Sequence, residues 1–195
     1  MPEPHSQSYT LPPTPNKKKQ NKLCVDIIGD SNVRGLGVLA QTEEISAAVV
    51  VNRGARVQDV ADRVPMMLRP ESDVVVLHLG TNNILDRNAS TSDSVKHYDK
   101  SIDQIKTHIG KRLLMVCAVP HCKDERTTVE TQKLNCYLKR KCERLGMHFI
   151  DASLTIADLG TDTVHLNRAA KLHLAGSIVM SAMGFHIMKC KHTEQ

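Results

Sequence analysis

Short apolar runs rich in Val and Ile recur along the chain, and each one closes at Gly, Asn, Pro or Ser. Runs of this length and composition, bounded by such residues, predict β-strands. They are nearly continuous in apolarity and do not alternate cleanly, which is typical of strands covered on both faces by helices. We predict five strands, at residues 23–29, 45–52, 73–80, 112–120 and 147–153.

Helical spacing is clearest between the third and fourth predicted strands, in residues 91–110. Apolar side chains recur there at intervals of three and four, which predicts an amphipathic helix. Ser92 or Asp93 is the expected N-cap, and Gly110 the expected end. The apolar positions that carry this prediction are Val95, Tyr98, Ile102, Ile105 and Ile109.

Three further helices follow from the same spacing. Residues 129–146 repeat the pattern and end at Gly146, whereas residues 56–68 contain Pro65, which predicts a kink or an early stop. The last helix is expected to start after Asn167. Its predicted buried positions are Ala170, Leu174 and Ile178.

Strands and helices therefore alternate along the chain, which predicts an α/β fold: a three-layer α/β/α sandwich with a five-stranded parallel sheet. A chain of 195 residues is long enough for one ordinary domain. We assign this domain to residues 22–190. Residues 1–21 are rich in Pro, Ser and Lys without periodicity, and we expect them to be a disordered basic linker.

The formal net charge of +5 is unevenly distributed, because residues 1–22 contain four lysines against the single acid Glu3. Such a tail is attracted to phosphate, so a membrane surface, a phospholipid or a nucleic acid is a candidate partner, although a solvated linker is an equal alternative. The segment before the lysines lacks the apolar stretch of a secretory signal, and no apolar run reaches membrane-spanning length. We therefore expect an intracellular, cytoplasmic protein. The four lysines are Lys17, Lys18, Lys19 and Lys22.

Residues with catalytic potential lie in the loops that follow the predicted strands. In an open parallel sheet, ligands bind beyond the carboxyl ends of the strands. Four of the loops, at residues 29–35, 52–56, 80–83 and 161–167, would therefore meet at one edge. Together they supply a hydroxyl nucleophile, an imidazole base, a carboxylate to orient that base, and donors for an oxyanion. The residues concerned are Ser31, Gly54, Asn82, Asp162 and His165.

This ordered set resembles the SGNH (GDSL-type) hydrolase family, whose four blocks stand here as Gly-Asp-Ser (29–31), Gly54, Gly-Thr-Asn (80–82) and Asp-Thr-Val-His (162–165). Within that family, the chain is most similar to the esterase domain encoded by the first open reading frame of vertebrate LINE-type (non-LTR) retrotransposons. That likeness rests on the segment IGDSNVRGLG, the small body and the lysine-rich linker. The resemblance implies a flavodoxin-like sheet and a serine esterase.

The resemblance also implies the role of each block. Ser31 would attack the acyl carbonyl with His165 as base and Asp162 as its partner, near the positive end of the first helix. The backbone N–H groups of Ser31 and Gly54 and the side-chain amide of Asn82 would form the oxyanion hole. Hydrolysis through an acyl-enzyme needs no metal ion and no organic cofactor. We expect short acyl groups such as acetyl, because the domain is small, and lipids are candidate carriers of these esters.

Two other functions are compatible with the sequence. A nucleic-acid- or membrane-associated module of a retrotransposon protein, with only minor catalytic activity, would use the fold as a scaffold. No Trp, three Tyr and two Phe leave few platforms for stacking bases, which weakens that alternative. A carbohydrate deacetylase is weakened by the same shortage of aromatic residues but not excluded. His78, inside an apolar strand, is interpreted as a hydrogen-bonded core residue.

Overall fold

The five predicted strands form one parallel sheet in the order β2-β1-β3-β4-β5 in a computed structural model, which describes residues 22–122 and 124–193. The expected linker, residues 1–21, lies outside these described residues, as do Lys17, Lys18 and Lys19. Strand order reverses at β1, which has β2 on one side and β3 on the other. The strands are β1 (Leu23–Gly29), β2 (Ile45–Val51), β3 (Val74–His78), β4 (Leu113–Cys117) and β5 (His148–Ile150).

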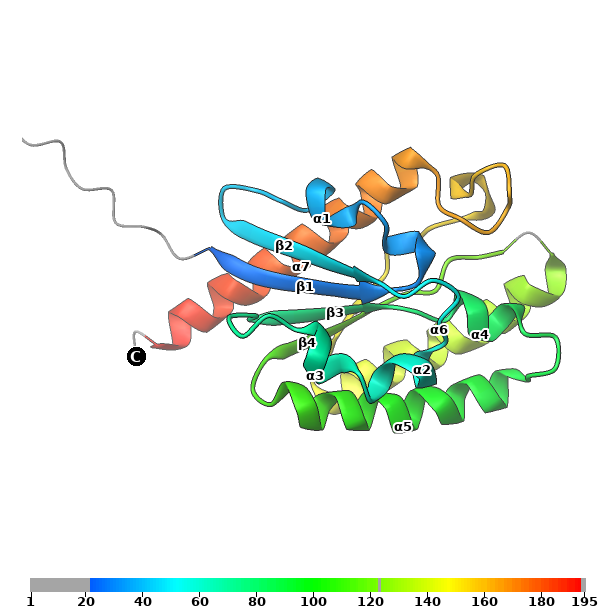
Figure 1. Cartoon of the computed structure of the whole chain (residues 1–195), viewed down its shortest axis with the longest axis horizontal. Coiled ribbons are helices and arrows are strands. Elements are labelled where there is room, and N and C mark those ends of the chain that lie inside the picture. Colours follow the sequence, from blue (N-terminus) through cyan, green and yellow to red (C-terminus); the bar gives the residue numbers. More distant parts are fainter. Residues whose placement is uncertain (1–21, 123, 194–195) are drawn as a thin grey trace, which may run out of the picture.

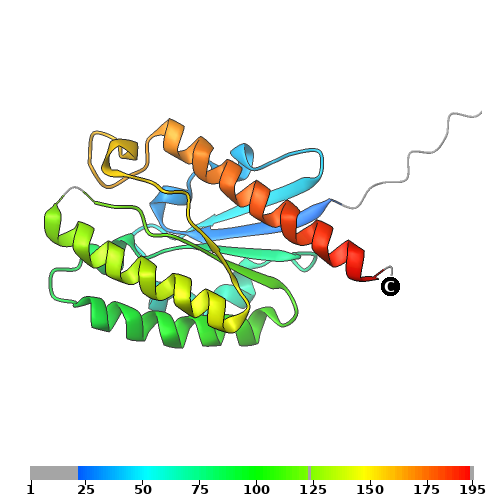
Figure 2. The same cartoon turned by 180° about the vertical axis from the view of Figure 1, so that it is seen from behind.

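Helices cover both faces of this sheet, so the fold is the predicted α/β/α sandwich (Figure 1). One face packs against α1 (Leu36–Leu39) and the long helix α7 (Arg168–Thr193), which crosses the sheet diagonally in Figure 2. The other face is covered by α2 (Val57–Ala61), α3 (Val64–Met67), α5 (Thr91–Ile109) and α6 (Glu125–Leu145). Two apolar cores result, one on each side of the sheet.

Short helical turns complete the chain: η1 (Ser31–Val33) after β1, α4 (Thr81–Leu85) after β3, and η2 (Ile156–Asp158) between β5 and α7. Ala170, Leu174 and Ile178 of α7 are buried, as their spacing predicted. In the part of the chain that is described, no helix is both long and apolar enough to cross a membrane.

Several predicted boundaries are wrong, for two physical reasons. The predicted third, fourth and fifth strands extend too far because residues just beyond them, such as Leu79, Val119 and Ala152, are buried although they lie in loops. Burial at the sheet edge therefore mimics strand periodicity. Helix α6 begins four residues earlier than predicted, because the side chain of Asp124 caps it by accepting the Thr127 N–H at 2.8 Å.

Two local predictions about helix ends also need correction. The N-cap of α5 is Ser90, whose side chain accepts the N–H of Asp93, while the Asp93 carboxylate accepts the N–H of Ser90. Asp93 is thus the third residue of the helix and not its cap. Of the two outcomes predicted at Pro65, the kink is wrong and the early stop is found: α2 ends at Ala61, and Pro65 lies in the first turn of the separate helix α3, where its missing N–H costs nothing.

Candidate active site

Ser31 lies directly beyond the carboxyl end of β1, at the point where strand order reverses. Open parallel sheets bind ligands at this position. The turn is packed against both neighbouring strands, because the Asn52 N–H donates to Gly29 O at 2.7 Å and the Asp30 N–H donates to His78 O at 3.3 Å. The serine is therefore held at the centre of the sheet edge.

Gly29 is required by this close packing. A Cβ at Gly29 would overlap Val33 Cγ1 and approach the backbone oxygen of His78 to 2.5 Å. Backbone atoms cannot yield as the end of a flexible side chain can, so any side chain at Gly29 pushes β1 away from β3. The first residue of the Gly-Asp-Ser block is therefore needed so that β1 and β3 can lie close together.

Asp30 shapes the turn that follows. Its Oδ1 accepts the N–H of Asn32 at 2.9 Å and so caps η1. Asp30 is buried, and its second oxygen has no hydrogen-bond partner among the described residues. The turn η1 spans three residues only, so the positive helix terminus expected beside Ser31 is not there: few peptide dipoles are aligned.

His165 meets Ser31 across 134 residues of sequence, with its Nε2 2.6 Å from the serine Oγ. The Nδ1 of the same ring is 2.5 Å from Asp162 Oδ2. When Nδ1 carries the proton that is donated to Asp162, Nε2 presents a lone pair to the serine hydroxyl. The structure therefore brings together the three side chains that the sequence singled out, in the order serine, imidazole, carboxylate.

Asp162 is fixed by the turn in which it lies. Its Oδ1 accepts the N–H groups of Val164 at 3.1 Å and His165 at 2.9 Å. These backbone hydrogen bonds, followed by the one to the imidazole, lower the pKa of Asp162 to about 2. The carboxylate is ionised at neutral pH, and its half-exposed position also favours the charged form.

Asn32 is a site residue that sequence reasoning missed. It is buried, its Oδ1 accepts the N–H of Leu166 at 2.9 Å, and its amide donates to Thr81 Oγ1 at 3.4 Å. Asn32 therefore connects the serine turn to the loop of His165 and to the start of α4. The only signal in the sequence was a polar residue immediately after the serine.

The other two expected oxyanion donors come from the loops that flank the Ser31 turn. Gly54 follows β2 with φ +69°, and Asn82 is the second residue of α4. The Asn82 amide donates to the backbone oxygen of Ala55 at 3.1 Å, so it is tied to the residue after Gly54. An amide has two N–H groups, and this contact engages one of them. The Asn82 side chain is therefore joined to the loop that contains Gly54.

Gly80, just before α4, allows this loop to form. Its φ is +119°, which residues with a side chain rarely adopt, and a Cβ there would lie 2.6 Å from both Tyr98 Oη and Val119 Cγ2. The Tyr98 hydroxyl donates to the Leu79 oxygen at 2.5 Å. Glycine is therefore required in the turn between β3 and α4, the helix that contains Asn82.

His78 departs from the sequence expectation. It is buried as predicted, but neither ring nitrogen has a hydrogen-bond partner among the described residues. Burial lowers the pKa of His78, and the negative charge of Asp30 opposes that shift. A neutral ring is therefore favoured, and His78 has no contact with Ser31 in the hydrogen-bond network.

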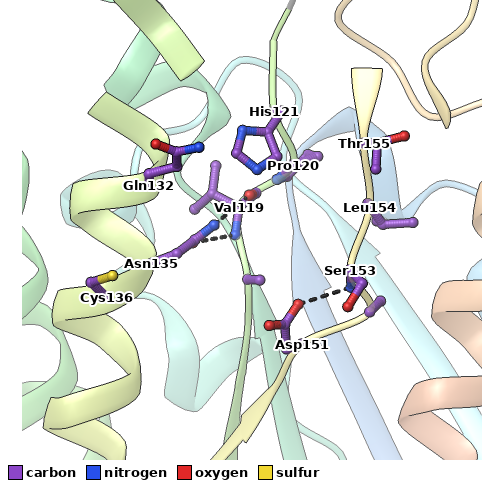
Figure 3. A pocket seen from close by; sticks show the side chains of 12 residues that line it. Val119, Pro120, His121, Gln132, Asn135, Cys136, Asp151, Ser153, Leu154 and Thr155 are labelled. Atoms are coloured by element: carbon purple, nitrogen blue, oxygen red, sulfur yellow. Dashed lines mark hydrogen bonds between the residues drawn. The ribbon is translucent and has the colours of Figure 1, made fainter. Parts of the chain in front are cut away.

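Two cavities lie along the edge. One, of about 250 Å³, is lined by Ser31, Arg34, His165 and Lys171. The other, of about 300 Å³, lies beyond β4 and β5, between His121, Asn135 and the 151–155 loop (Figure 3). There the Asn135 side chain accepts the Val119 N–H and donates to the Val119 oxygen, which fixes the loop after β4 to α6. The first cavity is the one that gives access to the serine.

Comparison with known proteins supports the same interpretation. The profile of the GDSL-like Lipase/Acylhydrolase family matches residues 27–173, which include every block described above. The chain belongs to this family. No curated protein is similar enough in sequence to count as a relative.

Several solved structures share the fold at low sequence identity. The chain resembles a lipase/acylhydrolase from Enterococcus faecalis (TM-score 0.70, 18% identity, covering 83% of this chain and 96% of that one). It also resembles Est24, a carbohydrate acetylesterase from Sinorhizobium meliloti (TM-score 0.71, 15% identity, covering 84% of this chain and 100% of that one). A third similar structure is the aryl esterase of M. smegmatis (TM-score 0.68, 15% identity, covering 83% of this chain and 99% of that one). At these identities the similarity establishes the α/β fold and no substrate.

Proposed function

We propose that this GDSL-family protein is a serine esterase that hydrolyses short-chain acyl esters, acetyl esters above all, through an acyl-enzyme on Ser31. The observation that carries the proposal is the 2.6 Å contact between Ser31 Oγ and His165 Nε2, with Nδ1 of the same ring on Asp162. A serine hydroxyl is a weak nucleophile near neutral pH and needs a base within hydrogen-bond reach. His165 meets that requirement.

The first half-reaction transfers the acyl group to the enzyme. The Ser31 proton passes to His165 Nε2 as Oγ bonds to the carbonyl carbon, and the negative charge moves to the carbonyl oxygen. The N–H groups of Ser31 and Gly54 and the Asn82 amide are the proposed donors to that oxygen. The intermediate then expels the alkoxide, which takes the proton from Nε2 and leaves as the alcohol.

The second half-reaction reverses these roles with water. Nε2 accepts a proton as the water oxygen bonds to the acyl carbon, and the new intermediate expels Oγ, which recovers the proton. The carboxylic acid leaves and the serine is restored. Asp162, ionised and hydrogen-bonded throughout, stabilises the imidazolium that forms in each half.

The size and lining of the cavity favour a small acyl group. It measures about 250 Å³, and none of the four residues that line it is apolar. A long acyl chain would need apolar walls to leave water. Acetyl and similarly short groups need none, which supports the proposed preference.

The test uses a fluorophosphonate probe and a chromogenic acetyl ester on the wild type, Ser31→Ala and Ser92→Ala. Ser92 is an exposed serine of α5 and serves as the matched control. We expect labelling and turnover in the wild type and Ser92→Ala, and neither in Ser31→Ala. Equal labelling of all three proteins would refute the assignment of the nucleophile.

A narrower kinship is also part of the proposal. The segment IGDSNVRGLG and the lysine-rich residues before it support an esterase domain of a retrotransposon first-open-reading-frame protein. Membrane lipid or nucleic acid is then the proposed partner of Lys17, Lys18, Lys19 and Lys22. Binding to anionic vesicles and to single-stranded RNA, each measured over a range of salt concentrations with residues 1–22 present or removed, tests this, because phosphate contacts weaken with salt.

A further inference from the structure

Two cationic side chains share the cavity of the proposed nucleophile. Arg34 lies three residues after Ser31, and Lys171 is the fourth residue of α7. The Lys171 ammonium donates to the backbone oxygen of Arg34 at 3.2 Å, so it is anchored to the serine turn. Two positive groups from distant parts of the chain thus line the cavity of Ser31.

Neither cation has an acidic partner among the residues that the structure describes. The ion pairs of the described chain involve other cations, namely Arg56, Arg69, Lys96, Lys133, Lys141 and His165. The carboxylate of the site, Asp162, is occupied by the His165 ring and by two backbone N–H groups. The charges of Arg34 and Lys171 are therefore not neutralised by an ion pair within the fold.

This arrangement works against stability. Burial and the charge of Arg34 lower the pKa of Lys171, which means that the site disfavours its protonated form. The first turn of α7 also holds Arg168 and Lys171 and no acidic residue, whereas the partial positive charge of a helix N-terminus favours acids there. An anionic group in the cavity would reverse both penalties.

We propose that Arg34 and Lys171 form an anion-binding subsite, and that the ester substrate carries a carboxylate or phosphate group within a few atoms of its scissile carbonyl. This inference rests on the proposed esterase function and names the substrate class. Guanidinium and ammonium groups make charge-assisted hydrogen bonds with both anions, and these are stronger than neutral hydrogen bonds. The cavity that holds them is large enough for a group of that size beside Ser31.

The kinetic test compares esters that differ in charge. On the alcohol side, 3-acetoxybenzoate is paired with its neutral methyl ester, and on the acyl side mono-4-nitrophenyl adipate is paired with its methyl ester. We expect kcat/KM to favour the anionic member of at least one pair by about tenfold or more, mainly through KM, and this preference to fall as salt is added. The favoured pair tells which side of the ester bears the charge.

The variants locate the effect. In the double variant Arg34→Gln/Lys171→Gln, the ratio of kcat/KM between anionic and neutral esters should fall to about one. Lys100→Gln removes an exposed charge from α5 and should leave the ratio unchanged. Thermal melting shows whether each variant is folded. Equal ratios in the wild type and the double variant would overturn the subsite.

A binding measurement separates this inference from the proposed function. Phenyl phosphate, benzoate and the neutral benzyl alcohol are titrated by NMR into Ser31→Ala, with and without the two glutamine substitutions. Binding of an anion that the substitutions abolish supports the subsite even if no ester is hydrolysed, in which case only the esterase proposal fails. Turnover of neutral esters with no anion binding keeps the esterase and overturns the subsite.

Discussion

The Oδ1 of Asn32 accepts the backbone N–H of Leu166 at 2.9 Å, which joins the turn of the proposed nucleophile to the loop of its proposed base. Asn32→Ala removes this acceptor and leaves a buried N–H without a partner, which costs about 1–3 kcal/mol of unfolding free energy. We expect kcat for the acetyl ester to fall, because the Ser31–His165 distance is no longer fixed. Urea denaturation and steady-state kinetics measure the two effects.

Asn88→Ala, at an exposed position after α4, is the matched control. It should change neither quantity. Asn32→Asp retains the Oδ1 acceptor and should recover part of kcat, which a role in stability alone does not predict. An unchanged kcat in Asn32→Ala would contradict the positioning role.

Gly80→Ala tests the close packing of Gly80 against Tyr98 and Val119. The new Cβ would approach Tyr98 Oη and Val119 Cγ2 to 2.6 Å at a φ of +119°, so we expect a loss of stability of at least about 1–3 kcal/mol and a drop in turnover. Gly176→Ala, in the middle of α7 with open space around it, should instead stabilise the protein by about 0.5–1 kcal/mol. Thermal melts that show the two substitutions equal would contradict this account.

Asn82→Ala tests the proposed oxyanion donor. Removing a donor of this kind lowers kcat by about 10²–10³. The loss of its hydrogen bond to the Ala55 oxygen affects a half-buried loop only, so the melting temperature should change little. Steady-state kinetics beside a melting curve separate the two, and a kcat within about twofold of the wild type would remove Asn82 from the hole.

The buried ion pair of Asp26 and Arg69 is expected to be the most sensitive polar contact away from the site. Asp26 is buried in β1, and Arg69 donates to it from Nε at 2.6 Å and from its backbone N at 2.8 Å. Arg69→Met leaves the carboxylate without its cation, which costs about 3–5 kcal/mol. Lys133→Met breaks an exposed pair with Glu130 and should cost less than about 1 kcal/mol. Urea denaturation of both variants provides the comparison.

The lowered pKa of Asp162 predicts a specific acid dependence of stability. Its pKa of about 2 in the folded protein lies below its ordinary value of 3.8, so the folded state binds this proton less readily than the unfolded chain does. The stabilising contribution is therefore complete above about pH 4 and is lost as the pH falls towards 2. Asp162→Asn should lack that component, and urea denaturation between pH 5 and pH 2 detects the difference.

The sequence predicted the sheet because strands buried on both faces must be apolar along their whole length. It did not predict the strand ends, since Leu79 and Val119 are equally apolar but lie in buried loops. The start of α6 was missed for the opposite reason: residues 125–128 are polar and carry no apolar spacing.

In the candidate site, too, some residues were predictable from the sequence and others were not. Ser31, Asp162 and His165 were recognisable because their chemistry fixes residue type and spacing. Asn32, Arg34 and Lys171 were not, because their significance lies in contacts made across more than a hundred residues. The sequence around Lys171 does not distinguish it from other lysines in the first turn of a helix. Only the fold shows that it shares a cavity with Ser31 and Arg34.

The serine and the imidazole belong to segments 134 residues apart, with four of the five strands threaded between them. Parallel strands cannot be joined by tight hairpins, so this contact forms only after long loops have closed. On the ribosome, a nascent chain whose α7 is still in the exit tunnel would leave the hydroxyl of Ser31, the proposed nucleophile, without its proposed base. Covalent labelling of that hydroxyl would therefore report the completion of folding and could be used to time it.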